Sequence, residues 1–253
     1  MKLKFGFLTA FFIFLLSLSA IGQVFVPIPP TINMSNVIMN NQIVNQIRNN
    51  ALGQQIISQG IIENAKKNGI RGTKKPSFTK NYTFPKELSF KPSGYSIVAK
   101  KLSENQNGKR NSADSRELET FFSSLWTNYL QSFREEHELG MPSADIASAL
   151  TFYVFNNYMI LNNLSSLESE KTIAVYKQVS NVLLGNSDVK KMSNEEKEFL
   201  AEMFVTLGNI PNLIYSKTQN QQEAAKAARE NLERIFGKNT DKLKITENGI
   251  ELK

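Results

Sequence analysis

The sequence contains no cysteine and a single histidine, and these absences exclude several classes of protein. Without cysteine the chain forms no disulfide, and no lipidated cysteine can follow a signal segment as in a bacterial lipoprotein. The histidine, His137, lies in the run Arg-Glu-Glu-His-Glu, which matches neither HExxH nor a two-histidine metal pattern. We interpret His137 as a solvated residue near a helix end and predict no metal-ligating residues.

Motifs for covalent catalysis and phosphate binding are also missing. The sequence has no nucleophile elbow that would place a serine beside His137. The run that begins at Gly69 and Gly72 lacks the spacing of a P-loop. We therefore predict no catalytic and no cofactor-binding residues, and no cofactor.

The N-terminus has the three parts of a secretory signal. Lys2 and Lys4 are followed by an apolar run over residues 5–16, and Ala20 and Gly22 are small residues at the positions that a signal peptidase reads. The alternative is an uncleaved anchor, but the apolar stretch is shorter than the ~20 residues that span a bilayer. We expect cleavage after Gly22, no membrane span in the mature chain, and a secreted or periplasmic location.

Charge is distributed unevenly along the chain. Residues 64–110 contain twelve Lys and Arg against two Glu, whereas residues 111–253 contain fifteen bases against twenty acids. A basic arm of this kind can bind a polyanion. The alternatives are that the two parts attract each other or that the basic part is a solvated linker.

The basic stretch also contains aromatic residues interleaved with its lysines, and two interpretations remain open. Aromatic and basic side chains together bind nucleic acid by stacking and phosphate contact, but for an exported chain we expect an anionic envelope polymer or a protein partner and no nucleic acid. The other interpretation is that the aromatic rings anchor this segment on the helical core while the lysines face water. The residues concerned are Phe78, Tyr82, Phe84, Phe90 and Tyr95, interleaved with Lys74, Lys75, Lys80, Lys86 and Lys91.

Residues 23–83 are interpreted as a variable lead and linker. Prolines in residues 23–32 favour an extended start. Residues 33–68 are rich in Asn and Gln, and the apolar stripes that include Ile43 and Ala65 indicate helix. Glycine and proline in residues 69–83 are typical of a linker.

From residue 84 onward the pattern predicts a helical domain. Pro92 and Ser93 offer a helix start, with Tyr95, Val98 and Leu102 on one face. Apolar residues at helical spacing, or strong helix formers, then predict helices over 118–133, 143–161, 166–184, from 193 to about Pro211, and 219–236.

Particular residues set the expected helix boundaries. Ser143 is a suitable N-cap, with Asp145 in the first turn, and Ser193 with Glu196 forms a capping box. Pro211 marks the end of a helix or a kink, while Gly185 and Gly237 follow helix ends.

The C-terminus changes to a period of two over residues 243–252, with Asn248-Gly249 between alternating apolar residues. This pattern is a strong hairpin signal. An isolated hairpin is marginal in water, so we expect it to pack on the helices or to pair with an extended segment over residues 88–90.

Three motifs carry a resemblance to a known family. They are the run from Asp145 through Ala147, Ala149 and Tyr153 to Asn157-Tyr158, the lead-in Phe90-Lys-Pro92-Ser93, and the closing Leu243-Lys-Ile245-Thr-x-x-Gly249-Ile250. Together they resemble a bacterial secreted family known as domain of unknown function 6683, over roughly residues 84–253. The resemblance implies no activity and no catalytic residues.

The sequence thus predicts a mainly α fold, a bundle of about five helices with a short C-terminal β-hairpin or strand pair. Its expected organisation is a signal peptide over 1–22, a lead and linker over 23–83 and a helical domain over 84–253. The expected role is a non-enzymatic binding, structural or interaction protein of the bacterial periplasm or exterior, with a protein or an anionic polymer bound through residues 64–110. The alternative is a small helical hydrolase acting on cell-wall or glycan material, for which Glu136, Glu138 and Glu202 would have to converge in a cleft.

Overall fold

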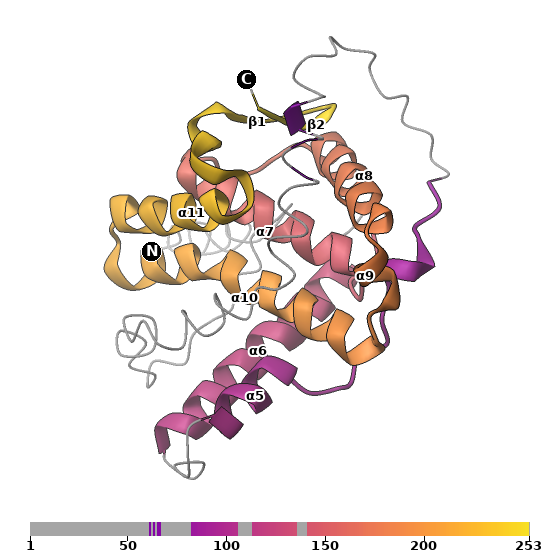
Figure 1. Ribbon diagram of the computed structural model, residues 1–253. Coiled ribbons are helices and arrows are strands. Elements are labelled where there is room, and N and C mark those ends of the chain that lie inside the picture. The colour runs from indigo at the N-terminus through magenta and orange to yellow at the C-terminus, as the bar shows by residue number, and fades with distance from the viewer. Residues whose placement is uncertain are drawn as a thin grey trace, which may run out of the picture.

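The computed structural model describes residues 61, 63, 65, 66, 82–105, 113–135 and 141–252. The expected signal peptide, most of the lead and linker, and the segment with Glu136, His137 and Glu138 lie outside the described residues. In the part that the structure describes, seven α-helices surround one core and a two-stranded sheet closes one end (Figure 1). The prediction of a mainly α fold with a C-terminal hairpin is confirmed.

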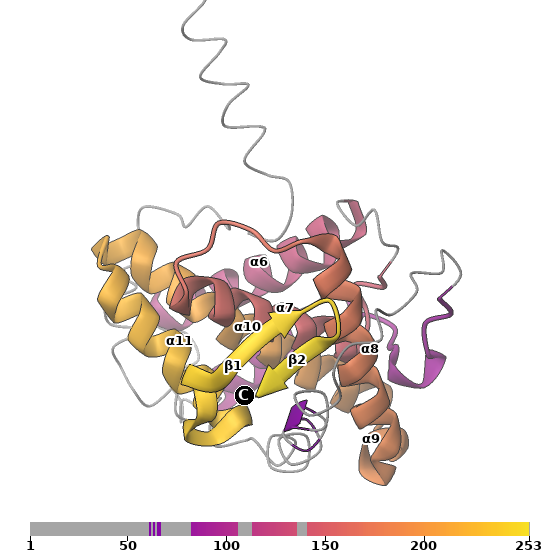
Figure 2. The same cartoon turned by 90° about the horizontal axis from the view of Figure 1, so that it is seen from above.

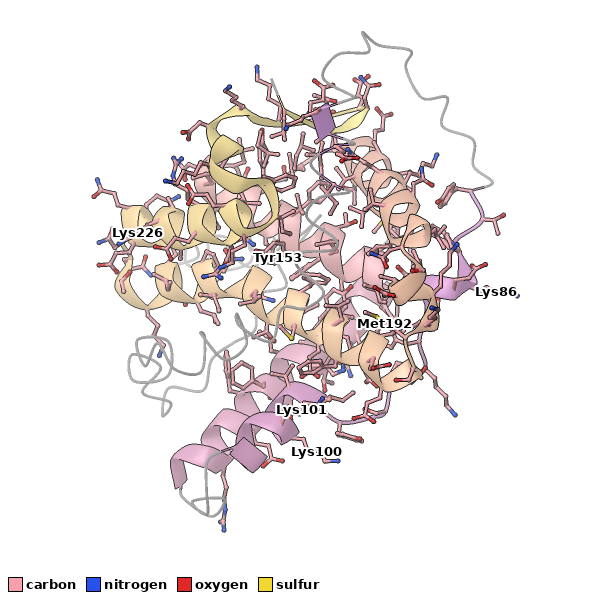
Figure 3. The ribbon with its side chains drawn as sticks, viewed as in Figure 1. Lys86, Lys100, Lys101, Tyr153, Met192 and Lys226 are labelled. Carbon is pink, nitrogen blue, oxygen red and sulfur yellow. The ribbon has the colours of Figure 1, made fainter. Side chains whose placement is uncertain are left out.

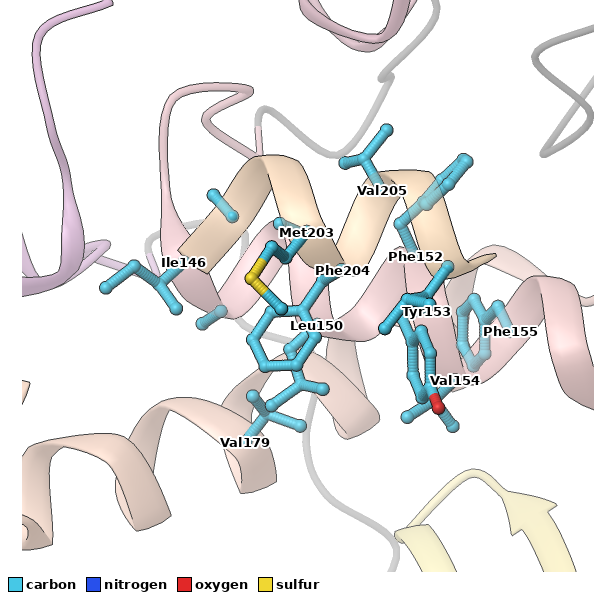
Figure 4. Close-up of a cluster of buried hydrophobic side chains, with 14 of the residues drawn as sticks. Ile146, Leu150, Phe152, Tyr153, Val154, Phe155, Val179, Met203, Phe204 and Val205 are labelled. Atoms are coloured by element: carbon cyan, nitrogen blue, oxygen red, sulfur yellow. The ribbon is translucent and has the colours of Figure 1, made fainter. Parts of the chain in front are cut away.

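Helix α7 (Ile146–Leu161) is the centre of the bundle. Fourteen of its sixteen residues are buried, so it is covered on all sides rather than along one stripe. Helices α8 (Ser169–Gly185), α10 (Asn194–Thr218) and α11 (Gln221–Phe236) pack directly against it. Leu150 and Tyr153 of α7 lie beside Phe204 and Met203 of α10 in this core (Figure 4).

The start of α7 differs from the sequence expectation. Asp145, not Ser143, is the N-cap, and its carboxylate accepts a hydrogen bond from the Ser148 amide at 3.0 Å. Both residues are acceptable caps, so local propensity does not distinguish them. Asp145 is fully buried and also binds Ser89, whereas Ser143 is only partly buried, so tertiary contacts favour Asp145.

Helix α10 begins as expected and ends later than expected. The Ser193 side chain accepts from the Glu196 amide and the Glu196 carboxylate accepts from the Ser193 amide, which confirms the capping box. Pro211 does not end the helix, which continues to Thr218. A proline leaves the carbonyl four residues earlier without a donor, and here the buried Asn231 amide donates to the Leu207 carbonyl at 2.9 Å. A side chain of α11 therefore replaces the missing backbone donor.

Helices α5 (Ile97–Asn105) and α6 (Ala113–Glu135) lie side by side at one end of the molecule (Figure 1). Helix α5 starts four residues later than the Ser93 start that the sequence suggested. Tyr95 precedes it and is 47 % exposed, so the expected apolar face does not include that residue. Ser96 caps the helix by accepting from the Ala99 amide at 2.9 Å.

Two short helical elements follow from local capping. Helix α9 (Ser187–Lys191) was not expected; its N-cap Asn186 accepts from the Asp188 and Val189 amides. A 3₁₀ turn, η2 (Gly237–Lys242), joins α11 to the hairpin, and Gly237 has a φ of 63°, which suits glycine at a helix end.

Strands β1 (Leu243–Thr246) and β2 (Gly249–Leu252) form the expected hairpin, with Thr246 opposite Gly249. Gly249 has a φ of 101°, while Glu247 and Asn248 do not have positive φ, so the turn is not the type I′ form usual for Asn-Gly. Seen from above, the hairpin lies across the bundle beside α8 (Figure 2). Of the two expected positions for the hairpin, packing on the helices is the one observed. Ser89 bridges Asp145 instead, and Leu88 belongs to a 3₁₀ turn, η1 (Lys86–Leu88).

The core also reaches into the N-terminal part of the chain. Residues 61, 63, 65 and 66 are helical, and Ile61 and Ala65 are fully buried within the main core cluster. Glu63 and Lys66 are exposed, so the four described residues follow an amphipathic helix pattern. Among the residues described, no helix is long and apolar enough to cross a membrane.

Candidate functional site

Residues 86–98, here called the strap, cross the surface of the bundle between η1 and the first turn of α5. Its backbone and serine side chains bind polar residues of α7 and α10 that are 56 to 110 positions distant in sequence. The buried ionisable groups of this region meet the strap from two sides. Asp145 and its neighbours form one side, and Glu202 and its neighbours form the other.

Asp145 holds the first half of the strap. Its carboxylate accepts from the Ser89 hydroxyl at 3.4 Å. The backbones of Ser89 and Asp145 also form an isolated antiparallel bridge. The Phe90 amide donates to the Ala144 carbonyl at 3.1 Å. The Phe90 ring stacks on Trp126, with 6.0 Å between the ring centroids. The strap is thus fixed here by both polar and aromatic contacts.

Three tyrosines complete the surroundings of Asp145. They are Tyr82 from the chain before η1, Tyr129 from α6 and Tyr176 from α8. Burial is the largest cause that raises the pKa of each phenol, and the charge of Asp145 adds to the rise. The Tyr176 side chain interacts with both Asp145 and Ser180. A carboxyl surrounded by phenols has neutral donors around it, and the described residues supply it with no ion pair.

Burial sets the protonation of Asp145. Removal from water raises its pKa from 3.8 to about 6, although hydrogen bonds from Ser148, Ala147, Ser89 and Tyr176 act in the opposite direction. The carboxyl is fully buried, so the loss of hydration outweighs the bonds that favour the charged form.

On the other side, α10 presents polar residues at every fourth position. Asn194, Glu198 and Glu202 lie on one face of the helix because residues four apart are neighbours there. The Asn194 side chain accepts from the Lys91 amide at 2.6 Å and donates to the Lys91 carbonyl at 2.8 Å. The Glu198 carboxylate accepts from the Ser93 amide at 2.9 and 3.0 Å and from its hydroxyl at 3.1 Å.

Glu202 completes the series at the start of α5. One carboxylate oxygen accepts from the Ile97 and Val98 amides at 2.8 and 3.1 Å, and the other accepts from the Ser96 hydroxyl. The first amides of a helix lack partners within the helix and carry a partial positive charge. Glu202 therefore serves as a capping anion supplied by a different helix.

The pKa of Glu202 is nonetheless raised, from 4.5 to about 7. Burial is the largest cause, the hydrogen bonds from Ser96, Val98 and Ile97 oppose it, and the charge of Glu198 adds to the rise. Glu198 and Glu202 are 0 % and 1 % exposed. Both acids are therefore used as hydrogen-bond acceptors inside the protein.

The structure tests part of the hydrolase hypothesis. Glu202 is buried against α5 rather than placed in a cleft, whereas Glu136 and Glu138 lie outside the described residues. His137 lies there too. Among the residues that the structure describes, no group of three metal-binding side chains comes together.

The aromatic residues of the basic stretch behave in two ways. Phe84 and Tyr82 pack on Tyr176 with ring centroids 5.2 and 6.0 Å apart, and Phe90 is buried on Trp126. These rings anchor the segment, as one of the two interpretations expected. Tyr95 is the exposed one, while Lys86 and Lys91 are exposed nearby in sequence. Phe78, Lys74, Lys75 and Lys80 lie outside the described residues.

Sequence reasoning placed Asp145 at the start of its helix but missed its contact with the strap, and it missed the roles of Asn194 and Glu198. Asn194, Glu198 and Glu202 share a four-residue spacing that could have been noticed, since it places three acceptors on one face of an otherwise apolar helix. Asp145 gave no comparable signal, because its partners are brought together only by the fold.

Together the fold and the strap define a small, mainly helical domain in which the buried acids Asp145, Glu198 and Glu202 hold backbone segments in place. The chain belongs to the family of unknown function DUF6683, whose model matches residues 8–253. This match extends well before residue 84, where the recognised motifs begin, and Ile61 and Ala65 share the core of the domain. No curated protein and no solved structure matches the chain.

Proposed function

We propose that the protein is an exported, non-enzymatic binding or interaction protein of the bacterial periplasm or exterior. The observation that carries the non-enzymatic part is the use of the two carboxyls with raised pKa values. Asp145 and Glu202 accept backbone amides at the starts of α7 and α5 and are at most 1 % exposed. A general acid must reach a substrate oxygen within hydrogen-bond distance, and these two carboxyls face the protein interior instead.

Export is supported by the N-terminal sequence, with two lysines followed by an apolar run and small residues. The test is fractionation of the native cells followed by N-terminal sequencing of the purified protein. We expect the mature chain to begin at Gln23 and to be found outside the cytoplasm. Phe12→Arg interrupts the apolar run and should retain the full-length chain in the cytoplasm. A native chain that keeps Met1 and fractionates with the cytoplasm would refute export.

The surface around Tyr95 is the best-supported binding region among the described residues. Tyr95 is 47 % exposed, and the Lys100 ammonium lies 5.5 Å from its ring centroid. Lys101 lies 4.2 Å from the ring centroid of Phe199. Aromatic faces beside ammonium groups suit an anionic polymer or an acidic protein partner. This region falls within the basic stretch of residues 64–110.

Retention on immobilised heparin, used as a model polyanion, tests this surface. The double variant Tyr95→Ala/Lys101→Ala should elute at lower salt than the wild type, and Lys74→Ala/Lys75→Ala should do the same if the whole stretch takes part. Lys226→Ala is the matched control, since Lys226 is exposed on α11, away from Lys100 and Lys101 (Figure 3). Elution of the wild type at low salt, unchanged in both double variants, would exclude polyanion binding and leave a protein partner.

The raised pKa of Glu202, about 7, is the one observation that favours the alternative of a hydrolase. Release of soluble glycan from purified cell wall is the assay that separates the two functions. If the wild type releases glycan and folded Glu202→Gln does not, the hydrolase is the better description.

A further inference from the structure

The bundle holds the strap mainly through oxygen acceptors. Asp145, Asn194, Glu198 and Glu202 accept hydrogen bonds from Ser89, Lys91, Ser93 and the first turn of α5. The Asn194 amide and the Lys197 ammonium add donors, to the Lys91 and Glu87 carbonyls at 2.8 and 2.6 Å. Three of the four acceptor residues are carboxylic acids, and all three are buried.

We propose that the strap is a pH-dependent latch, fastened to α7 and α10 in weakly acidic solution and loosened in weakly alkaline solution. In the fastened state the three acids are buried and face backbone amides and hydroxyls. In the loosened state they regain water. The balance between the two states therefore depends on whether Asp145 and Glu202 carry a charge.

The groups that face Glu202 do not neutralise its charge. From α5 and the strap these are the Ser96 hydroxyl and the Ile97 and Val98 amides, and from its own helix Glu198, a second acid one turn away. The Lys101 charge acts on the exposed Glu196 instead. When Glu202 is ionised, the amide dipoles therefore stabilise its charge, whereas the charge of Glu198 repels it.

The groups that face Asp145 are neutral throughout the same pH range. They are the Ser148 amide of α7, the Ser89 hydroxyl of the strap, and the phenols of Tyr129 on α6, Tyr176 on α8 and Tyr82. The pKa of each of these phenols is above its ordinary value of 10.

The sign of the effect follows from the pKa values in the fastened state. Asp145 and Glu202 have pKa values of about 6 and about 7 there, above the 3.8 and 4.5 of the solvated groups. The fastened state therefore binds protons more tightly than the loosened state. Its advantage is complete near pH 4 and is lost as the pH rises through 6 and 7.

Loosening changes the start of α5 first. The Ile97 and Val98 amides lose their capping carboxylate and the Ser93 amide loses Glu198, so these amides become open to exchange with solvent. Helix α5 packs on α6 and α10, so its first turn is one of the points at which α5 is held to the bundle.

Hydrogen–deuterium exchange of the full chain tests the latch. The ratio between Glu202→Gln and wild type is measured at each pH, so that the intrinsic pH dependence of exchange cancels. For a peptide covering residues 93–99 we expect roughly fivefold or greater excess exchange in the wild type at pH 8, and rates within about twofold at pH 5. The substituted glutamine side chain keeps an oxygen that accepts the two amides but carries no charge.

Two comparisons isolate the effect. Glu195→Gln removes an exposed charge from the first turn of α10. The ratio of its exchange to that of the wild type should be close to one at both pH values. A peptide within residues 147–155 of the buried α7 reports global opening and should show a smaller difference than the strap.

A ratio for residues 93–99 that is the same at pH 5 and pH 8 would overturn the latch and leave Glu202 a purely structural cap. If Glu202→Gln fails to fold, Asp145→Asn is measured on residues 86–92 by the same criterion, because asparagine also caps helices. For this variant too, a ratio of exchange to wild type that does not depend on pH overturns the proposal. Excess exchange of the wild type that occurs only in alkaline solution supports it.

Discussion

At the scale of single residues, the junction of α7, α10 and α11 depends on one buried amide. The Asn231 amide donates to the Leu207 carbonyl and to the Asn157 side-chain oxygen, both at 2.9 Å. The Tyr153 hydroxyl donates to the Asn231 carbonyl at 2.6 Å. Pro211 creates the need for this arrangement, because it cannot supply the amide that would otherwise bind Leu207. A proline in α10 and an asparagine in α11 therefore act together.

A double-mutant cycle measures that coupling. Asn231→Ala should destabilise the protein by about 2–4 kcal/mol, because it leaves buried acceptors without a donor. In a Pro211→Ala background the residue 211 amide can bind the Leu207 carbonyl, so the same change should cost about 1 kcal/mol less. Urea unfolding of the four proteins gives the coupling energy. Equal costs in both backgrounds would contradict the link between Pro211 and Asn231.

Gly208 permits the close approach of α10 and α7. A Cβ at this position would lie 3.1 Å from the Tyr153 Cα and 3.4 Å from two atoms of the Phe152 ring. The nearest neighbour is backbone of the fully buried central helix, which has little freedom to move.

Gly208→Ala should therefore lower the free energy of unfolding by about 1 kcal/mol or more, despite the better helix propensity of alanine. The matched control is Gly185→Ala in α8, where a Cβ meets nothing within 4 Å. That change should raise stability by up to about 1 kcal/mol. Thermal or urea unfolding measures both variants. A stabilised Gly208→Ala would show that the two helices can separate at little cost.

At the scale of secondary-structure elements, a side chain substitutes for a third strand. The Gln178 side chain accepts from the Ile250 amide at 2.6 Å and donates to the Ile250 carbonyl at 3.1 Å. These are the bonds that a neighbouring strand would make. A two-stranded hairpin is marginal alone, and this clamp from α8 fixes its outer edge.

Gln178→Ala should leave the Ile250 amide and carbonyl unpaired and loosen the hairpin at a cost of about 1–3 kcal/mol. Hydrogen–deuterium exchange should show the loss of protection first in residues 249–252. The control Gln222→Ala changes an exposed residue of α11 and should stay within about 0.5 kcal/mol of wild type. Unchanged protection of the hairpin in Gln178→Ala would mean that apolar packing alone holds it.

The elements that sequence predicted well are those with local signals. The Ser193 and Glu196 capping box, the end of α11 at Gly237 and the Asn-Gly hairpin each involve residues within a few positions of one another. Predictions were wrong where local signals were ambiguous. Ser143 was expected as the cap where Asp145 is observed, and of the two outcomes considered for Pro211, an end of the helix is not the one observed.

The contacts that build the candidate site could not be read from local patterns. Glu202 binds the Ile97 amide 105 positions away, and Gln178 binds Ile250 72 positions away. Such pairs depend on how helices pack, which one sequence does not specify by spacing alone. Glu198 and Glu202 are buried and bind the strap, which the sequence of their own helix does not reveal.

At the scale of the whole molecule, one continuous core joins elements from both parts of the chain. It includes Ile61 and Ala65 of the N-terminal part as well as Ile245 and Ile250 of the hairpin. Asp145 lies inside this core at the start of its central helix. A change of its charge therefore affects the stability of the fold as a whole.

The free energy of unfolding should consequently depend on pH in an unusual direction. Asp145 has a pKa of about 6 in the folded protein against 3.8 when solvated, so the folded state binds its proton more tightly. The stability it contributes is present below pH 4 and is lost as the pH rises through 6, by at most about 3 kcal/mol. Glu202 acts in the same direction through about pH 7.

Urea unfolding at pH 5 and pH 8 tests this expectation in wild type and Asp145→Asn. Asparagine keeps the N-cap without the charge, so the variant should be more stable than wild type at pH 8 and gain nothing at pH 5. Asp188→Asn, at an exposed position in α9, should show no such difference. If Asp145→Asn loses the same stability at both pH values, the buried charge is compensated within the fold, and the pH dependence of the wild type must then come from Glu202 alone.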